Sequence, residues 1–407
     1  MASILRWAKG SLRRAPSTPL RFPTSGFEVV PESVVLEEEQ FEEFRAGLYY
    51  PMKPGEVLAS RYQVIGKLGF GRTSTVWLAH DMREHQHVTI KAYTRETNVL
   101  DEFDTYRKLS KADPSHSGFP FVRTALDTLS IPRIGGDHSC LVQQPMWGSM
   151  LDLLGGNLIN NGLPEGVLKV ALKDILAALD YLHTECQLIH TDIKCDNILI
   201  DIEDTSVYET FTKAELEHPS RRKVVDGKVV CASRPFDRPR EFGKPVLGDF
   251  GSAVSGIEVQ THSAQPVIYR APEMMLNAGW RYPVDIWNVG ALVWDMFEGR
   301  HLFYGQDPNG NGYSTRAHLA EVIALLGPPP VDLLERGKRS SEFFGEDGAW
   351  IAEVEIAKNE TLEKCEYILE GRNQEMFLDF VRGMLTWRPE DRMTARDLLQ
   401  DPWLNSA

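Results

Sequence analysis

A polar octet at residues 190–197, HTDIKCDN, constrains this chain more than any other feature of its sequence. Apolar, strand-like residues flank it on both sides, so the octet is expected to be a loop held between two short strands. It carries a carboxylate at Asp192, an ammonium at Lys194 and an amide at Asn197. Groups at this spacing can hold a nucleophile, a phosphate and a metal ion at one point. An ordinary polar loop is the alternative, and the rest of the chain has to decide between the two.

The bulk composition indicates a soluble protein with a proper core. The chain has 407 residues, 42% of them apolar, enough for two or three domains or for two lobes with appendages. Its five cysteines show no CxxC spacing, which argues for a reducing compartment and against a disulfide framework or a zinc site. No apolar run approaches the roughly 18 residues that cross a bilayer. We therefore expect an intracellular protein, in the cytoplasm, the nucleus or both, without membrane contact.

The net charge of −14 disfavours direct nucleic-acid binding, which requires a basic surface. An acidic surface can attract a basic protein substrate, or it can simply keep the protein soluble. Both readings stay open at this point.

Residues 1–60 are expected to form a largely disordered extension, first basic and then acidic. Residues 1–27 contain five basic residues and no acid, as in a mitochondrial transit peptide, but three prolines favour a disordered tail. An acidic run follows at residues 37–43 and is expected to be a solvated face.

Residues 61–147 predict a small, mainly antiparallel β lobe with one main helix. Segments rich in Val, Ile, Thr and aromatic residues predict its strands, at residues 62–65, 74–79, 87–93 and 139–143. Residues 100–109 predict a charged amphipathic helix.

Residues 148–404 predict a larger, helical lobe. One core-facing stripe recurs at steps of four and three, through Leu168, Leu172, Ile175, Leu179 and Leu182. Residues 284–297 are apolar almost all round, which predicts a buried helix. Further helices are predicted at residues 317–326, 375–385 and 395–399, the last with a cap from Thr394 and Asp397. Residues 202–244, charged and proline-containing, predict a surface insertion in this lobe.

Residues 68–76, which begin at Leu68, fit the glycine-rich loop that covers nucleotide phosphates. Gly69 and Gly71 lack side chains, so backbone N–H groups can approach an anion closely. Ser74 stands where a third glycine is usual, and Val76 would lie against the base. A plain glycine turn is the alternative.

A lone lysine, Lys91, lies in the third predicted strand and matches the VAIK strand whose lysine holds the α- and β-phosphates. Its partner would be Glu102 on the following helix, chosen over Asp101 and Asp104 from its spacing to the apolar residues there. An exposed strand lysine is the alternative.

Two more motifs follow in the required order. The DFG motif at residues 249–251 supplies a metal-binding Asp249, and the APE motif at residues 271–273 ends an activation segment. Glu273 is expected to be buried, so it needs a cationic partner, and Arg392 is the candidate. Each motif is weak by itself, but five motifs in this order and on suitable elements are strong together.

With these motifs the chain resembles eukaryotic protein kinases from about residue 62 to residue 404. More narrowly it is similar to the SR-protein kinases, which phosphorylate serines in Arg/Ser-rich splicing factors, and especially to their fungal relatives. Thr191 is the most specific residue, since most kinases have Arg there. Further matching segments are residues 50–62, 67–78, 249–253, 269–270 and 318–327. The resemblance implies an α+β, bilobal protein-kinase fold and an ATP- and Mg²⁺-dependent serine/threonine kinase that acts on proteins involved in mRNA splicing.

The resemblance also implies residue roles in the helical lobe. Asp192 would accept the proton of the substrate hydroxyl, and Lys194 would steady the γ-phosphate. Asn197 and Asp249 would bind magnesium.

In the β lobe, the resemblance implies that Lys91, held by Glu102, grips the α- and β-phosphates. Gln143 falls at the gatekeeper position, where an apolar residue is more common. Gln144 and Met146 would offer backbone groups to adenine.

The chain departs from the usual kinase pattern at the substrate side. Pro266 stands where serine/threonine kinases usually keep a threonine hydroxyl, which bears on the substrate class. The spacer at residues 202–244 is short beside that of the family. Thr191 brings no charge that an activating phosphate would have to balance, so we expect activity without phosphorylation of the activation segment.

Three alternatives remain from sequence. One is a nucleotide-binding pseudokinase scaffold, another a serine/threonine kinase with a substrate outside the Arg/Ser class, and the third a small-molecule kinase of related fold.

An acidic segment in the helical lobe could dock Arg-rich substrates or could be solvated helix faces; its residues are Glu353, Glu355, Glu360, Glu363, Glu366 and Glu370. We expect a monomer.

Overall fold

The computed structural model describes residues 15–155, 162–225 and 227–406, which divide into two compact units. The first unit comprises the described residues up to Val99, together with Ala125–Trp147 and Ile202–Phe242. The second comprises Leu100–Thr124, Gly148–Asp201 and the described residues from Gly243 onward. The predicted α+β, bilobal architecture is confirmed.

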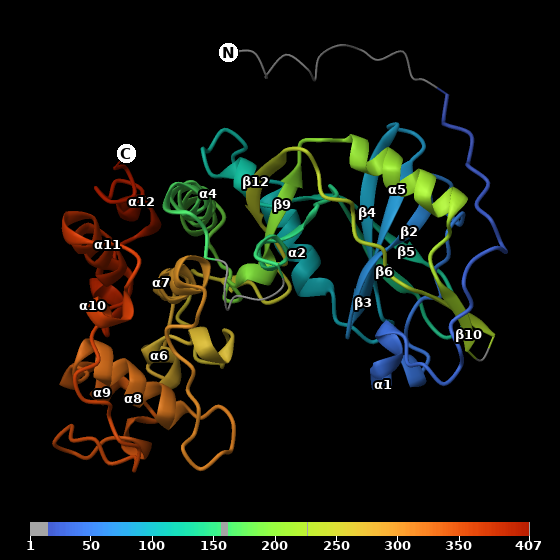
Figure 1. Cartoon of the computed structure of the whole chain (residues 1–407). Helices are drawn as coiled ribbons and strands as arrows, with labels where there is room; N and C mark the ends of the chain where they lie inside the picture. The colour runs from blue at the N-terminus through green and yellow to red at the C-terminus, as the bar shows by residue number, and fades with distance from the viewer. Residues whose placement is uncertain (1–14, 156–161, 226, 407) are drawn as a thin grey trace. The chain divides into compact units, whose positions relative to one another are not determined.

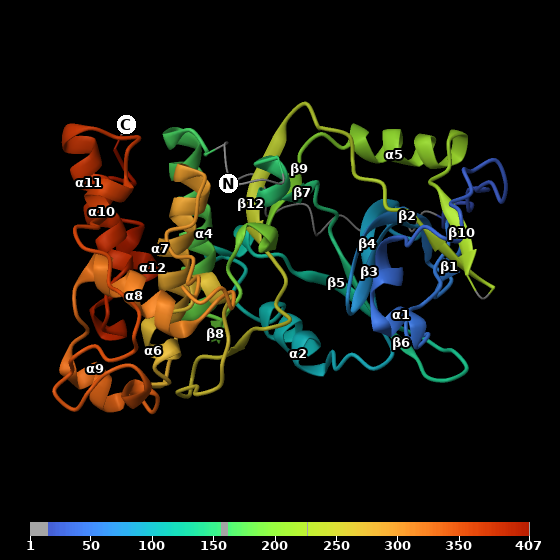
Figure 2. The same cartoon turned by 60° about the horizontal axis from the view of Figure 1, so that its bottom comes forward.

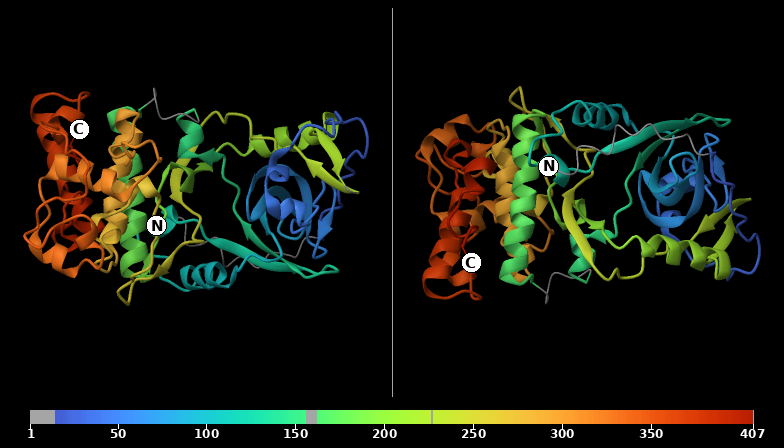
Figure 3. Two further views of the ribbon diagram at one scale, coloured as in Figure 1. Left: turned by 90° about the horizontal axis from the view of Figure 1, so that it is seen from below. Right: turned by 90° about the horizontal axis from the view of Figure 1, so that it is seen from above.

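The first unit is built on a six-stranded antiparallel sheet with strand order β1-β2-β3-β4-β6-β5. Its strands are β1 (Val57–Leu58), β2 (Tyr62–Gly71), β3 (Ser74–Asp81), β4 (Gln86–Tyr93), β5 (Ala125–Ile131) and β6 (His138–Gln143). Figure 3 shows that the sheet of this unit is strongly curled. Alternate residues of these strands face one core, among them Val64, Trp77 and Ile90. The four predicted strands of this lobe are therefore confirmed, with boundaries shifted by a few residues.

The insertion belongs to the β-rich unit, so its predicted place in the helical lobe is wrong. It forms α5 (Ser206–Glu217), β10 (Arg222–Val225) and β11 (Lys228–Cys231), and α5 packs across the sheet against β2 (Figure 1). Phe211 of α5 packs so closely that a Cβ at Gly66 would lie 2.8 Å from its ring. Its few apolar residues are thus buried in a shared core with Ile65 and Leu78. The composition of the insertion does not reveal this placement, because a few apolar residues on one face are enough to dock a helix.

The described part of the N-terminal extension is ordered, contrary to expectation. It contains α1 (Glu42–Arg45), and Glu38, expected to be solvated, is only 6% exposed. Glu37 and Glu38 contact the ammonium of Lys67, and Glu39 pairs with Lys223 at 2.8 Å. Both lysines are distant in sequence, so local charge patterning could not indicate them. The predicted basic tail falls mostly outside the described residues.

The second unit is largely helical and is organised around α7 (Pro283–Glu298), whose residues from Val284 to Glu298 are all buried. α4 (Glu165–Thr184) runs beside α7 (Figure 2) and buries the predicted leucine and isoleucine stripe. α2 (Leu100–Leu109) also groups with this unit, although it was predicted as the main helix of the β lobe. Its Tyr106 packs edge-on against Phe250, with ring centroids 5.6 Å apart, which explains the difference.

Shorter helices complete the second unit: α3 (Met150–Leu153), α6 (Pro272–Met275), α8 (Thr315–Leu326), α9 (Val331–Arg336), α10 (Leu362–Cys365), α11 (Gly371–Met384) and α12 (Ala395–Leu398). The predicted cap of the last helix is confirmed, because Thr394 and Asp397 form a reciprocal capping box. Across the described part of the chain, no helix combines the length and the apolar character needed to cross a membrane.

Candidate active site

Two small sheets of short strands hold the octet beside the DFG motif within the second unit. β8 (Leu188–Ile189) pairs with β13 (Val254–Ser255), while β9 (Ile198–Ile202) lies between β12 (Phe242–Leu247) and β7 (Gly148–Ser149). The octet connects β8 to β9, and the DFG motif connects β12 to β13. Because each connection ends on strands that pair with those of the other, the two loops lie together. The backbone N–H of Gly248 donates to the carbonyl of Asn197 at 2.9 Å, which joins them directly.

Asp192 is held by the two polar residues predicted to act with it. The amide Nδ2 of Asn197 donates to Oδ2 of Asp192 at 2.7 Å and to its carbonyl oxygen at 2.8 Å. The ammonium of Lys194 lies 3.1 Å from the same Oδ2. Among the described residues both side-chain contacts therefore use Oδ2, so Oδ1 can receive a substrate proton. The structure brings these three predicted residues together at one point.

Cys195, in the middle of the octet, takes no part in this cluster. Its thiol is buried, and burial raises its pKa well above the ordinary value. It therefore stays a protonated packing group and does not act as a nucleophile.

The octet is anchored by Asp285, a residue that sequence reasoning missed. Its fully buried carboxylate accepts the backbone N–H groups of His190 and Thr191, each at 2.8 Å. It also contacts Nε2 of His183 at 3.0 Å. One signal was present: an acid in the first turn of an otherwise apolar helix must find partners when the helix is buried.

His190 orients the chain on either side of the Asp192 carboxylate. Its Nε2 lies 3.0 Å from the carbonyl of Gly248, and its Nδ1 accepts the N–H of Asp192 at 3.2 Å. A ring with this pair of contacts carries its proton on Nε2 and donates it to Gly248. His190 therefore ties Asp192 to the residue just before Asp249.

Two residues at the site have left-handed backbone conformations that favour glycine. Thr191 has φ of 68° and Asp249 has φ of 58°. Such conformations persist where the surrounding structure imposes them, and they gather at active sites. For Thr191 the imposing contacts include its hydroxyl, which is buried and donates to the carbonyl of Ser252 at 2.9 Å.

Asn197 and Asp249 would suit a divalent cation that is bound together with substrate phosphates. Asp249 and Asn197 offer one carboxylate and one amide oxygen, and no cluster of three or more His, Cys, Asp or Glu side chains among the described residues could hold a metal by itself. Magnesium typically uses one or two carboxylates together with substrate phosphates, so this donor set fits.

Glu102 lies on the buried face of α2, next to the DFG motif. It is 7% exposed, whereas Asp101 and Asp104 are exposed, which supports the choice of Glu102 among the three acids. A Cβ added at Gly251 would lie 3.4 Å from Oε2 of Glu102 and 3.4 Å from Oδ1 of Asp249. The pairing of Glu102 with Lys91 stays a prediction.

The predicted glycine-rich loop is the hairpin between β2 and β3, in the first unit. Gly69 pairs with Val76 and Gly71 with Ser74 across the hairpin. A Cβ at Gly69 would meet nothing within 4 Å, and one at Gly71 would meet only Ser74, at 3.9 Å. The space above these glycines is thus open to an approaching phosphate.

Lys91 and the predicted adenine-contacting residues lie on neighbouring strands of the same sheet. Lys91, on β4, pairs with Val76 on β3 and with Leu141 on β6. Gln143, the last residue of β6, is buried. Gln144 follows it and is exposed, and Met146 is half-buried. The sheet therefore places the phosphate-side and base-side candidates on neighbouring strands of one unit.

The predicted partnership of Glu273 and Arg392 is present and fully buried. Nη1 and Nη2 of Arg392 each lie 2.6 Å from a different oxygen of Glu273, and both side chains are 0% exposed. The guanidinium also donates to the carbonyls of Thr386 and Pro283 and lies 5.0 Å from the ring of Trp287. This bidentate, hydrogen-bonded pair holds the end of the activation segment against the helical core.

Comparison with known proteins agrees with this geometry. Residues 62–404 match the protein kinase domain. The chain is 42% identical to a serine/threonine protein kinase of Aspergillus fumigatus over 96% of both chains. It is 31% identical to the serine/threonine-protein kinase SRPK of Physarum polycephalum over 90% of this chain and 91% of the relative. It is 25% identical to SRSF protein kinase 3 of Homo sapiens over 91% of this chain and 90% of the relative.

Proposed function

This chain belongs to the protein kinases, as a serine/threonine kinase of the SR-protein-kinase group, and we propose that it phosphorylates serines in Arg/Ser-rich proteins involved in mRNA splicing. The observation that carries the catalytic part is the cluster in which Asn197 and Lys194 hold Asp192 beside the DFG motif. The pseudokinase alternative would require the loss of Asp192, Lys91 or Asp249, and all three are present.

In the proposed reaction, the substrate hydroxyl oxygen bonds to the γ-phosphorus of ATP while its proton passes to Asp192. The bond to the bridging oxygen breaks, and ADP leaves. Lys194 would steady the transferred group and Lys91 the α- and β-phosphates, while Asn197 and Asp249 would hold magnesium to neutralise developing charge. Catalysis of this kind is mostly positioning and electrostatic stabilisation.

For the substrate, we propose that the acidic segment of the second unit attracts arginine side chains. Five of its glutamates are exposed, and four of these form no ion pair within the described part of the chain: Glu353, Glu355, Glu360 and Glu370. The other two are engaged. Glu363 pairs with Arg382, and Glu366 is 2% exposed and accepts the N–H groups of Ile368 and Leu369. The docking proposal therefore narrows from six glutamates to four.

A variant that combines Glu355→Gln, Glu360→Gln and Glu370→Gln is expected to raise KM for an Arg/Ser peptide roughly three- to tenfold. KM for a Pro-directed serine peptide should stay unchanged, because that peptide lacks the clustered positive charge. The measurement is steady-state kinetics on both peptides at two salt concentrations, with a weaker effect at high salt. A matched control replaces three exposed glutamates of the first unit, Glu84, Glu96 and Glu203, by Gln. Equal KM values of the two triple variants for the Arg/Ser peptide would contradict the proposed docking surface.

Treatment with a phosphatase is expected to leave the activity unchanged. The buried Thr191 hydroxyl holds the start of the activation segment by a neutral hydrogen bond to Ser252, so no phosphate is needed to balance a charge there. The check is the rate of peptide phosphorylation before and after treatment, with mass spectrometry to verify that the activation segment carries no phosphate. A collapse of the rate after treatment would contradict constitutive activity.

We further propose that magnesium is the working divalent ion, that the enzyme is a monomer without direct nucleic-acid binding, and that it acts in the cytoplasm or nucleus. The donor set at Asn197 and Asp249 supports the first, and the net charge supports the absence of nucleic-acid binding. Comparing activity with Mg²⁺ and with Ca²⁺ tests the metal. Light scattering tests the oligomeric state, and imaging of the tagged full chain tests the location. A mitochondrial signal in the imaging would instead favour the transit-peptide reading of the N-terminus.

A further inference from the structure

The N-terminal extension contacts the tip of the glycine-rich loop. We call residues 36–49 the brace. The hydroxyl of Tyr49 lies 2.7 Å from the carbonyl oxygen of Gly71 and 2.6 Å from that of Arg72, so its single proton is shared between two loop carbonyls. Tyr49 is 7% exposed. Burial raises the pKa of its hydroxyl well above the ordinary value, so the group donates throughout the working pH range.

Two more contacts join the brace to the loop. The ring of Phe41 lies 6.3 Å from that of Phe70, and Glu43 pairs with Arg72 at 2.7 Å. Phe70 stands between Gly69 and Gly71, and successive residues of a strand point to opposite faces. The brace therefore holds the loop from the face opposite to the open side of the two glycines.

A buried ionic cluster anchors the brace to the sheet. The side chain of Lys67 on β2 is 0% exposed, and its ammonium contacts Glu38, Glu37 at 2.6 Å and the carbonyl of Cys231 at 3.1 Å. Glu37 also accepts the hydroxyl of Ser233 at 2.8 Å. Removing one partner from such a cluster leaves an uncompensated buried charge, so the brace is held firmly at its base.

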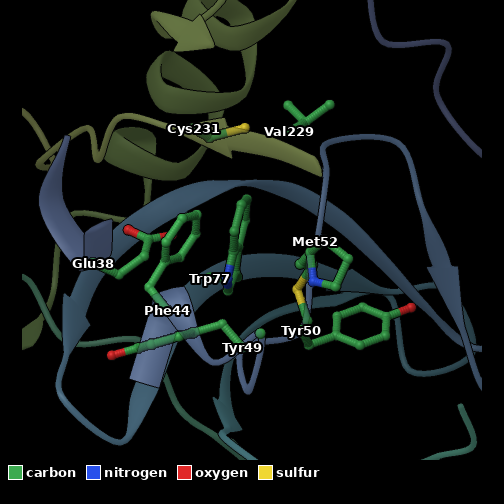
Figure 4. A pocket seen from close by; sticks show the side chains of 10 residues that line it. Glu38, Phe44, Tyr49, Tyr50, Met52, Trp77, Val229 and Cys231 are labelled. Atoms are coloured by element: carbon green, nitrogen blue, oxygen red, sulfur yellow. The ribbon is translucent and has the colours of Figure 1, made fainter. Parts of the chain in front are cut away.

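The space between brace and sheet is filled by side chains. Figure 4 shows Glu38, Phe44 and Tyr49 gathered around Trp77 of β3. The cavity that remains measures about 10 Å³, roughly the space of one water molecule, so it is no ligand site. A displacement of the brace would therefore be transmitted to the sheet and the loop.

We propose that the brace is a positioning element for the nucleotide and that Tyr49 is its positioning residue at the glycine-rich loop. The inference rests on the proposed function only in that the loop covers ATP. A glycine-rich hairpin tip loses backbone freedom when it closes over a phosphate. Contacts that order the tip beforehand lower the entropy cost of binding, and this gain is the same for substrate and transition state. Tyr49 should therefore act on KM for ATP and not on kcat.

The test is Tyr49→Phe, which removes only the hydroxyl. KM for ATP is expected to rise about three- to tenfold, while kcat and KM for the peptide stay near their wild-type values. A purely structural role would lower the active fraction, hence kcat, and leave KM for ATP unchanged. Titration with a fluorescent ATP analogue provides an independent measure of affinity.

Tyr50→Phe is the matched control. The two tyrosines are adjacent, but Figure 4 shows their hydroxyls pointing in opposite directions, and that of Tyr50 donates to Glu56 and not to the loop. A KM for ATP in Tyr49→Phe no higher than in Tyr50→Phe would overturn the proposal. If Tyr49→Phe does not fold, Glu43→Gln carries the test, with a smaller rise of KM in the same direction and the same criterion. A wild-type enzyme that transfers no phosphate would instead refute the proposed function, so the two failures are distinguishable.

Discussion

Asp192→Asn is expected to lower kcat for peptide phosphorylation by roughly 10²–10⁴-fold, while binding of ATP stays close to wild type. Asn has the same size as Asp, and its Oδ1 can still accept the amide proton of Asn197, so the loop keeps its shape. It cannot take up the substrate proton, so the chemical step alone loses its acceptor. Single-turnover transfer and ATP titration separate the two effects.

The control for this prediction is Glu185→Gln, which removes an exposed carboxylate at the end of α4 in the same unit. It should leave both transfer and ATP binding unchanged. Transfer near the wild-type rate in Asp192→Asn would show that Asp192 is not the proton acceptor, and the proposed mechanism would be wrong.

Arg392→Met is expected to destabilise the second unit by about 3–5 kcal/mol, because it leaves the carboxylate of Glu273 buried without its partner. Methionine keeps part of the side-chain volume, so the loss comes chiefly from the uncompensated charge and not from a cavity. Unfolding by heat or denaturant, followed by tryptophan fluorescence, measures the loss directly, since Trp287 lies beside the guanidinium.

Arg396→Met supplies the matched control. Arg396 lies four positions away and pairs with Asp180 at 3.3 Å, but its side chain is 63% exposed, so its loss should cost less than about 1 kcal/mol. The double variant Glu273→Leu/Arg392→Met should regain much of the stability lost by Arg392→Met, since it removes both buried charges. Equal midpoints for Arg392→Met and Arg396→Met would contradict the structural role assigned to the buried pair.

Local patterns predicted the cluster around Asp192 because its members lie close together in the chain. Asp192, Lys194 and Asn197 fall within six residues, so a single loop conformation brings their side chains to one point. The apolar stripe of α4 and the all-round apolar surface of α7 could likewise be predicted, because both patterns are visible within a few helical turns of sequence. The pairing of Glu273 with Arg392 could be predicted although the two residues lie far apart in the chain. The reason is that a buried glutamate in the APE motif requires a cationic partner.

Long-range partnerships without such a motif could not be predicted. Asp285 stabilises the octet from a helix about a hundred residues away, and nothing near the octet indicates it. The placement of the insertion on the β-rich unit depends on a few apolar side chains of α5, too few to change its composition. The main helix likewise groups with the second unit because its buried face packs on Phe250, a residue far along the chain.

By itself, then, the sequence determined the kinase family, the two-lobe α+β architecture and most helices and strands, because these depend on residue type at short spacing. Only the tertiary structure decided which charges are buried and which loops are held. The run Glu37 to Glu39 illustrates the difference. Its local pattern is that of a solvated face, but lysines on β2 and β10 bury it, and the segment it anchors reaches the glycine-rich loop through Tyr49. The physical reason is that the free energy of a charge depends on its surroundings, and folding alone brings distant residues together to form them.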